Sequence, residues 1–360
     1  MIPAAAVVQD LRGLLLPELE GLAERLGERR FRGRQIARWL YTHGAGTVDE
    51  MTDLPHGFRS QLQAGWRVSG LVVHRAYDAP DGSATKFLVA LDDGQTIECV
   101  LMRFDDGRRT ACISTQVGCA MGCGFCATGL SGFSRNLSAG EILGQALLIR
   151  ARADARLSNV VFMGMGEPLA NYDATIRSAQ LLSAPYGLGI GMRHLTISTV
   201  GLVPQIRRLA KERLQLTLAV SLHAPTDDLR TRLVPVNQRY PLADLLAACR
   251  EYVAETGRRI TFEYVLIEGM NDHDEEAYTL ARLVRDVHCH INVIPLNPVA
   301  GIGLRRPPVP RVHAFARILH RAGIPSTIRI ERGTDIQAAC GQLRLAEGLG
   351  HPSRWTPVPQ

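Results

Sequence analysis

Several features are missing from this sequence of 360 residues. No apolar run approaches the ~18 residues that a membrane-spanning helix needs. The segment Ile2–Val8 has neither a basic lead nor a following small-residue cleavage site, so we expect no secretory leader. No coiled-coil pattern or repeated apolar face indicates an oligomer, so we expect a monomer. These absences predict a cytoplasmic protein that has no membrane contact.

Lysine is nearly absent as well. Of the 41 Lys and Arg residues, only Lys86 and Lys211 are lysines. The net charge of +6 and a pI near 9.0 are typical of proteins with polyanionic partners. Genome base composition also produces an excess of arginine, although arginine suits bidentate phosphate contacts better than lysine does. We therefore take the places where arginines cluster, rather than net charge, as the indication of RNA binding.

A disulfide framework is not indicated either. The chain is long enough for one large α/β domain with a smaller appendage, and its 46% hydrophobic content is ordinary for a globular protein. Its 8 cysteines are unevenly spread. Such clustering favours a metal site or redox chemistry. The cysteines are Cys99, Cys112, Cys119, Cys123, Cys126, Cys249, Cys289 and Cys340.

The first part of the chain, from Val8 to Trp66, has helical apolar spacing and no strand signal. Within it, the segment Glu28–Tyr41 interleaves arginines with aromatic residues. We call its basic residues the arginine patch; they form either a solvated helix face over core aromatics or a surface that contacts RNA phosphates. The patch consists of Arg29, Arg30, Arg32, Arg34 and Arg38.

The next part, from Val68 to Arg103, alternates polar and apolar residues in three short stretches separated by Asp-Gly turns. It predicts a small antiparallel sheet that connects two domains. The stretches are Val72–Ala76, Ala84–Leu91 and Thr96–Leu101.

From Thr110 onward, strands and helices alternate, which predicts a parallel sheet with right-handed crossovers. Six such units predict an α/β fold of the partial (β/α)6 barrel type. The expected strands are Thr110–Gln116, Asn159–Met163, His194–Ser198, Leu216–Ser221, Ile260–Leu266 and Ile291–Pro295. The expected helices include Ser138–Ala151, which a capping box opens, Leu242–Glu255 and Arg311–Ala322. The predicted division is 1–67 helical accessory domain, 68–104 β linker, 105–343 core and 344–360 tail.

The strongest motif is a C-x3-C-x2-C loop directly after the first barrel strand. Its thiolates, on Cys119, Cys123 and Cys126, can converge on three corners of a cubane cluster and leave one metal corner open. The alternative is a structural zinc site completed by a distant fourth ligand, although this spacing is unusual for zinc.

This loop resembles that of the radical S-adenosylmethionine (SAM) superfamily. The resemblance implies a [4Fe–4S] cluster whose open iron binds the amino and carboxylate groups of SAM. Electron transfer then cleaves SAM to a 5′-deoxyadenosyl radical.

Three further segments of the chain carry a narrower resemblance. They are Cys112–Cys119, Gly132–Leu137 and Arg332–Leu343. These segments resemble those of the RlmN/Cfr group of RNA adenine methyltransferases, and the resemblance extends over nearly the whole chain. It implies methylation of adenosine C2 in 23S ribosomal RNA (23S rRNA) and in transfer RNA (tRNA) anticodon loops, with electrons from a flavodoxin-type reductant. Two alternatives remain: Cfr-type methylation at C8, and an RNA-binding protein whose cluster is only structural.

The resemblance gives two isolated cysteines catalytic roles. Cys340 is first methylated by one SAM molecule, and the radical from a second SAM removes a hydrogen from the S-methyl group. The resulting carbon radical adds to adenine, and Cys112 resolves the adduct by forming a transient disulfide with Cys340. Taken alone, both read as buried structural cysteines. Cys99, Cys249 and Cys289 match no catalytic position.

Glu98 matches the family's general base, which would manage a proton at the adenine ring or adduct. The alternatives are that it is an exposed strand carboxylate, or that Asp92, Asp93 or Asp106 is the base, because the alignment needs one extra residue in the Asp105–Thr110 loop.

The SAM site is expected at the carboxyl ends of the barrel strands, where barrel enzymes place their active residues. Taken alone, Glu167 with Pro168 forms a common turn, Ser198 caps a helix and His223 is a core histidine. Agreement among four strand ends favours a binding site. By resemblance, the SAM contacts are Gly166, Glu167, Ser198, Ser221, Leu222, His223 and Asn297.

Overall fold

The computed structural model describes residues 9–299, 301–329 and 332–343. The segment Ile2–Val8 and the predicted tail 344–360 lie outside the described residues. None of the helices in the described ranges is long and apolar enough to cross a membrane.

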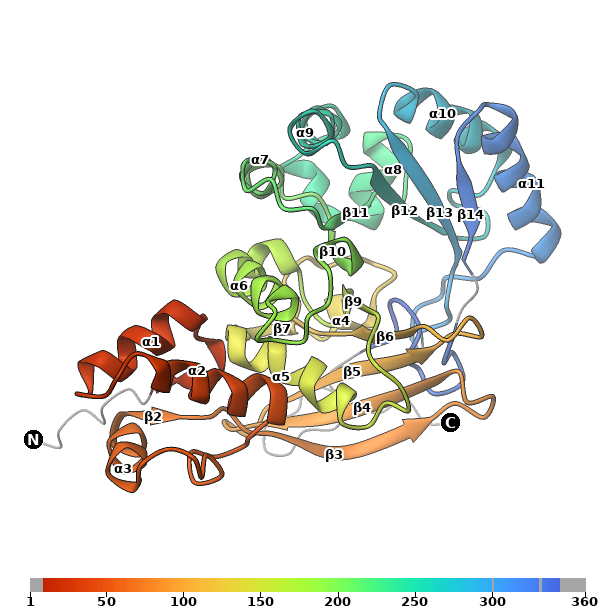
Figure 1. Cartoon of the computed structure of the whole chain (residues 1–360). Coiled ribbons are helices and arrows are strands. Elements are labelled where there is room, and N and C mark those ends of the chain that lie inside the picture. Colours follow the sequence, from red (N-terminus) through yellow and green to blue (C-terminus); the bar gives the residue numbers. More distant parts are fainter. Residues whose placement is uncertain (1–8, 300, 330–331, 344–360) are drawn as a thin grey trace, which may run out of the picture.

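A mixed sheet of ten strands, counted over the described residues, is the frame of the molecule (Figure 1). The strands from β14 to β6 are parallel, and β3, β4 and β5 continue from β6 as an antiparallel edge. This confirms the predicted partial-barrel α/β fold. The order is β14 (Ser326–Ile328), β13 (Cys289–Pro295), β12 (Ile260–Leu266), β11 (Thr217–Ser221), β10 (Leu195–Thr199), β9 (Asn159–Phe162), β6 (Arg109–Cys112), β5 (Thr96–Arg103), β4 (Ala84–Leu91) and β3 (Leu71–Asp78).

Three details differ from the expectations. The antiparallel strands do not form a separate small sheet, because β5 pairs with β6 and so extends the barrel sheet. The predicted strand Thr110–Gln116 stops at Cys112, and β7 (Gln116–Gly118) pairs instead with β8 (Phe133–Asn136). Finally, β14 is an additional parallel strand whose three residues are too few to show a periodic signal.

Helices connect successive parallel strands along the chain and cover the outer side of the sheet (Figure 1). The capping box that opens α5 is confirmed: the Glu141 amide donates to Ser138 Oγ at 3.1 Å, and the Ser138 amide donates to Glu141 Oε2 at 2.8 Å. The helices are α4 (Ala127–Leu130), α5 (Ala139–Arg150), α6 (Tyr172–Ser183), α7 (Val203–Lys211), α8 (Asp227–Leu233), α9 (Leu242–Thr256), α10 (Asp274–Val284) and α11 (Val309–Arg321).

The N-terminal part is helical as predicted, apart from the paired two-residue strands β1 (Gln9–Asp10) and β2 (Trp66–Arg67). Helices α1 and α2 approach closely because residue 33 is glycine; a Cβ there would lie 2.4 Å from the Glu20 amide nitrogen. Arg150 of α5 donates to Tyr41 O at 2.9 Å, which joins this part to the core. The helices are α1 (Leu16–Arg25), α2 (Phe31–Ala37), continued by a wider turn over Arg38–His43, and α3 (His56–Gly65).

Candidate active site

A cavity lies at the carboxyl ends of the parallel strands and gathers most of the predicted site residues. Three of the predicted site residues, Leu222, Cys112 and Glu98, are not among the described residues that line this cavity. Leu222 is buried, and its backbone amide and carbonyl already bond Glu263 O and the Arg230 guanidinium. The predicted residues that do line the cavity are Cys119, Cys123, Cys126, Gly166, Glu167, Ser198, Ser221, His223, Asn297 and Cys340.

The three-cysteine loop is held against the chain on both sides. The Cys119 amide donates to Gly132 O at 2.7 Å, and the Gly124 amide donates to Leu233 O at 3.1 Å. Gly118 must be glycine, since its φ is 76° and a Cβ would lie 2.0 Å from Gly132 O. The cysteines therefore sit on a fixed loop rather than a mobile one.

The arrangement of these thiols fits a cluster. Burial raises the pKa of Cys119 to about 11 and also raises that of Cys123, so only a bound cation would favour their thiolates. In the described part of the chain, no three His, Cys, Asp or Glu side chains are grouped as a single metal ion requires. Three thiols on one loop that line one cavity can bind separate iron corners of a cubane.

Glu167 is a buried carboxylate at the end of β9. Its Oε1 accepts from the Leu169 amide at 3.0 Å, and its Oε2 accepts from the Val200 amide at 2.9 Å. Burial nevertheless raises its pKa to about 7. The preceding Gly166 has a φ of 100°, and a Cβ there would lie 2.8 Å from the Gln116 nitrogen. The turn can therefore present both backbone and carboxylate to the amino group of a ligand.

His223 is held in one tautomer beside the cavity. Its Nδ1 accepts from the Val265 amide at 3.1 Å, which places the ring proton on Nε2. Burial lowers its pKa to about 3, so the ring is neutral. Its φ of 60° is uncommon for a residue with a side chain, and Asn271 Nδ2 holds its carbonyl at 2.8 Å. The constrained backbone and the cavity-lining position favour a ligand contact over a core role.

Arg230 of α8 organises two of these strand ends, and the sequence analysis missed it. Although fully buried, it donates to Val200 O at 2.6 Å, Ser221 O at 3.0 Å and Leu222 O at 3.1 Å. Burial lowers its pKa to about 10. The sequence offers no signal for this role, because Arg232 follows two residues later in the same polar helix and is exposed.

The segment 332–343 carries Cys340 to the edge of the cavity. Asn297 Nδ2 donates to Cys340 O at 3.0 Å, and the Ala127 amide donates to Gly341 O at 2.8 Å. Cys340 is exposed, whereas Asn297 Oδ1 is buried without a hydrogen-bond partner. An unsatisfied buried acceptor on the cavity wall is what a donor-bearing ligand such as SAM would satisfy.

Cys112, at the end of β6, lies within electrostatic range of Cys340. Burial raises the pKa of Cys112 to about 12, and the Cys340 thiol raises it further, whereas Arg329 opposes the change. Cys340 in turn is the main influence that raises the pKa of Arg329, which lies 3.6 Å from Glu263 Oε2. The two cysteines expected to act together therefore interact electrostatically with each other and with the same cation, Arg329.

Glu98 is a buried carboxylate rather than an exposed strand residue. It is 2% exposed, and its Oε1 lies 2.9 Å from Lys86 Nζ. The alternatives are surface residues: Asp92 pairs with Arg67, and Asp106 pairs with Arg108. Glu98 differs from both in being buried in the sheet.

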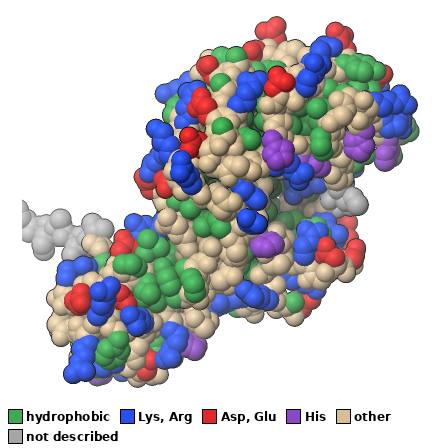
Figure 2. Space-filling model, turned by 45° about the horizontal axis from the view of Figure 1, so that its top comes forward, with side chains coloured by type: hydrophobic (Ala, Val, Ile, Leu, Met, Phe, Trp, Pro, Cys, Tyr) green, Lys and Arg blue, Asp and Glu red, His purple; other side chains and the backbone are tan. Residues whose placement is uncertain are grey.

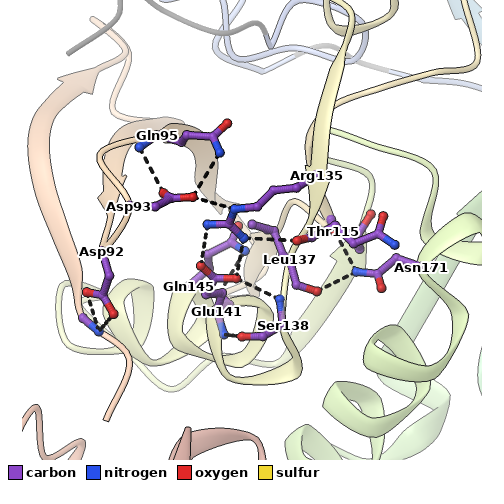
Figure 3. A network of polar contacts seen from close by, with 12 residues as sticks. Asp92, Asp93, Gln95, Thr115, Arg135, Leu137, Ser138, Glu141, Gln145 and Asn171 are labelled. Atoms are coloured by element: carbon purple, nitrogen blue, oxygen red, sulfur yellow. Dashed lines mark hydrogen bonds and ion pairs between the residues drawn. The ribbon is translucent and has the colours of Figure 1, made fainter. Parts of the chain in front are cut away.

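The third alternative, Asp93, belongs to a polar network that joins the β4–β5 turn to β8 and α5 (Figure 3). Arg135 donates to Asp93 Oδ2 at 2.7 Å and to Glu141 at 2.8 and 2.9 Å. Burial acts to raise the pKa of Asp93. The hydrogen bonds from Arg135 and Gln95 outweigh this effect and hold the pKa at about 2. A carboxylate held in this way is a poor base, and its role is to fix the Gly132–Leu137 segment.

The arginine patch is partly neutralised. Arg30 and Arg34 both pair with Glu20, and Arg38 pairs with Asp53. Their side chains remain 63%, 70% and 57% exposed, so each keeps a face toward solvent. On the face shown in Figure 2, Lys and Arg side chains are scattered among acidic ones over both lobes, and the surface is hollowed between them.

The fold and the three-cysteine loop define a radical SAM protein, and a model of the radical SAM superfamily matches residues 113–281. A model of the ribosomal RNA large subunit methyltransferase N-terminal domain matches residues 9–68. Proteins of this superfamily use a [4Fe–4S] cluster and SAM.

Curated relatives identify the family. A probable dual-specificity RNA methyltransferase RlmN from Moorella thermoacetica is 53% identical, over 94% of this chain and 97% of its own length. The corresponding protein from Chloroflexus aurantiacus is 51% identical, over 91% of this chain and 90% of its own length. The crystal structure of a radical SAM methyltransferase from Sphaerobacter thermophilus matches with a TM-score of 0.89 and 51% identity, over 94% of this chain and 99% of that one. The chain belongs to the RlmN family.

Proposed function

We propose that this protein is a radical SAM methyltransferase that methylates C2 of adenosine in 23S rRNA and in tRNA anticodon loops. The observation that carries the proposal is that Cys340, in segment 332–343, lines the three-cysteine cavity, with Cys112 near enough for the charges of the two thiols to interact. The names of the relatives, dual-specificity RNA methyltransferase, support RNA as the substrate class and favour C2 over the Cfr-type C8. A purely structural cluster would not require a cysteine pair at this place.

Different residues of the chain would have different roles in this reaction. A bound [4Fe–4S] cluster with SAM supplies a 5′-deoxyadenosyl radical when reduced. Cys119, Cys123 and Cys126 would hold the cluster, while Asn297, Glu167 and His223 would hold SAM. Cys340 would carry the methyl carbon to adenine, a ring whose amidine carbon is electrophilic and resists polar methylation. Glu98 would take the proton, and Cys112 would release the product from Cys340.

The test is anaerobic incubation of cluster-reconstituted protein with SAM, a reductant and unmodified 23S rRNA, followed by nucleoside mass spectrometry against 2-methyl- and 8-methyladenosine standards. We expect 2-methyladenosine from the native protein and none from Cys340→Ala. Formation of 8-methyladenosine alone would replace the proposal with the Cfr-type activity. SAM cleavage without either product would contradict the proposed substrate. If 2-methyladenosine appears, tRNA is the next RNA to assay.

The N-terminal residues 1–67 would bind RNA away from the reacting base, through the exposed faces of the arginine patch. We expect the triple variant R30Q/R34Q/R38Q to weaken RNA binding about ten-fold at low salt, because each lost phosphate contact removes a counterion-release contribution. SAM cleavage should be unchanged. Filter binding at several salt concentrations measures the first effect, and 5′-deoxyadenosine release measures the second. Equal loss of both would count against the assignment.

A further inference from the structure

Lys86 and Glu98 form a buried ion pair. The proposed chemistry gives a role to Glu98 but none to Lys86. Lys86 of β4 is 7% exposed and Glu98 of β5 is 2% exposed, with Nζ and Oε1 2.9 Å apart. Lys86 is also one of two lysines in a chain whose other basic residues are arginines. Lysine at this position is therefore an exception to the preference of this chain for arginine.

The register of the sheet places this pair on the same face as Cys112. Leu88 pairs with Glu98, and Val100 pairs with both Lys86 and Cys112 across the antiparallel edge. Residues directly opposite each other share a face, as do residues two apart in one strand. Lys86, Glu98 and Cys112 consequently point to one side of the sheet.

The Cys340 segment covers that same face. Lys86 Nζ donates to Gln337 O at 3.4 Å, and a Cβ at Gly333 would lie 3.0 Å from the Cβ of Ala84. Gln337 has a φ of 53°, an uncommon conformation for a residue with a side chain. Lys86 thus bonds a constrained turn that lies three residues before Cys340.

We propose that Lys86 is a positioning residue: its ammonium group holds the Glu98 carboxylate and the Cys340-bearing segment together over one face of the sheet. This inference rests on the proposed function, in which Glu98 and Cys340 act on the same adenine. A carboxylate as buried as Glu98 needs charged or hydrogen-bonding partners, and Lys86 is one of them. The flexible lysine reaches both the carboxylate and a backbone carbonyl, whereas a planar guanidinium would bring additional donors into the same closed space.

The experiment compares K86M, K86R, E98Q and K86M/E98Q in the reconstituted protein, with K211M as the matched control at the other lysine, which is exposed on α7. The readout is methyladenosine formed per 5′-deoxyadenosine released. We expect K86M to lower this ratio about 100-fold, as loss of general base catalysis does, while 5′-deoxyadenosine release continues. K86R should recover part of the ratio, and K211M should leave it unchanged.

The double variant distinguishes positioning from general destabilisation. If Lys86 acts through Glu98, K86M/E98Q will lose far less than the product of the two single losses, since the two residues act as one unit. K86M/E98Q also removes both charges of the pair, so it remains testable if K86M folds poorly. Additive losses, or equal loss of methyladenosine and 5′-deoxyadenosine in K86M, would overturn the inference.

A second measurement does not depend on the reaction. Hydrogen exchange of the holoprotein should show the amides of Ile336 and Ala338, which bond Gly333 O, exchanging about ten-fold faster in K86M than in K211M. Unchanged exchange would refute the tether even where methylation is lost. Faster exchange in K86M, with no methyladenosine from the native protein, would keep the tether and refute the proposed function.

Discussion

Replacing Arg230 by methionine is expected to lower the free energy of unfolding by about 4 kcal/mol, because three backbone carbonyls and an amide oxygen lose their charged donor inside the core. The guanidinium donates to Val200 O, Ser221 O, Leu222 O and Asn237 Oδ1. Methionine fills a similar volume, so the loss comes from unsatisfied acceptors rather than from an empty cavity. Chemical denaturation of the protein measures it.

The same substitution should also impair the site. Arg230 bonds the ends of β10 and β11, so its loss frees the backbone next to Ser198, Ser221 and His223, and SAM affinity should fall. R230K is the matched control, since it keeps the charge and one or two of the bonds and should lie between the two forms. An R230M protein whose unfolding free energy stays within about 1 kcal/mol of the native value would show that water satisfies these carbonyls.

The contrast between Arg230 and the three-cysteine loop shows which features a sequence can reveal. Cys119, Cys123 and Cys126 are close in the chain, so their spacing alone indicates a shared ligand. Arg230 acts on carbonyls up to thirty residues away, and its partners are backbone atoms that every residue has. No local pattern distinguishes such an arginine from an exposed one.

The strands show the same difference between local patterns, which the sequence reveals, and long-range pairing, which it does not. The six predicted barrel strands correspond to β6 and β9–β13, although β6 ends at Cys112 rather than at Gln116. Whether β5 pairs with β6 is a long-range property, which alternation within Thr96–Leu101 does not specify. The ion pair of Lys86 and Glu98 depends in the same way on the pairing of β4 with β5, so the burial of Glu98 could not be predicted from its own strand.

The largest expected effect on the reaction follows from the neighbouring cysteines. In the proposed mechanism, the thiolate of Cys112 attacks the sulfur of Cys340. The sulfur–carbon bond breaks toward the adenine-bound carbon, which takes a proton and becomes the methyl group, and a disulfide remains for an external thiol to reduce. Cys112→Ser should therefore lower methyladenosine formation by about 1,000-fold or more, since serine cannot form the disulfide.

The intermediate should accumulate in this variant. Because Cys340 is still present, Cys112→Ser should trap RNA on the protein as a covalent adduct that survives denaturation, whereas Cys340→Ala should trap none. Gel electrophoresis under denaturing conditions, with labelled RNA, measures the adduct. Cys99→Ser is the matched control, because Cys99 is also buried but alternates to the opposite face of β5 from Val100, the partner of Cys112. Full turnover by Cys112→Ser, or an equal adduct with Cys99→Ser, would contradict the proposed resolving role, since proximity to Cys340 would then have no consequence for product release.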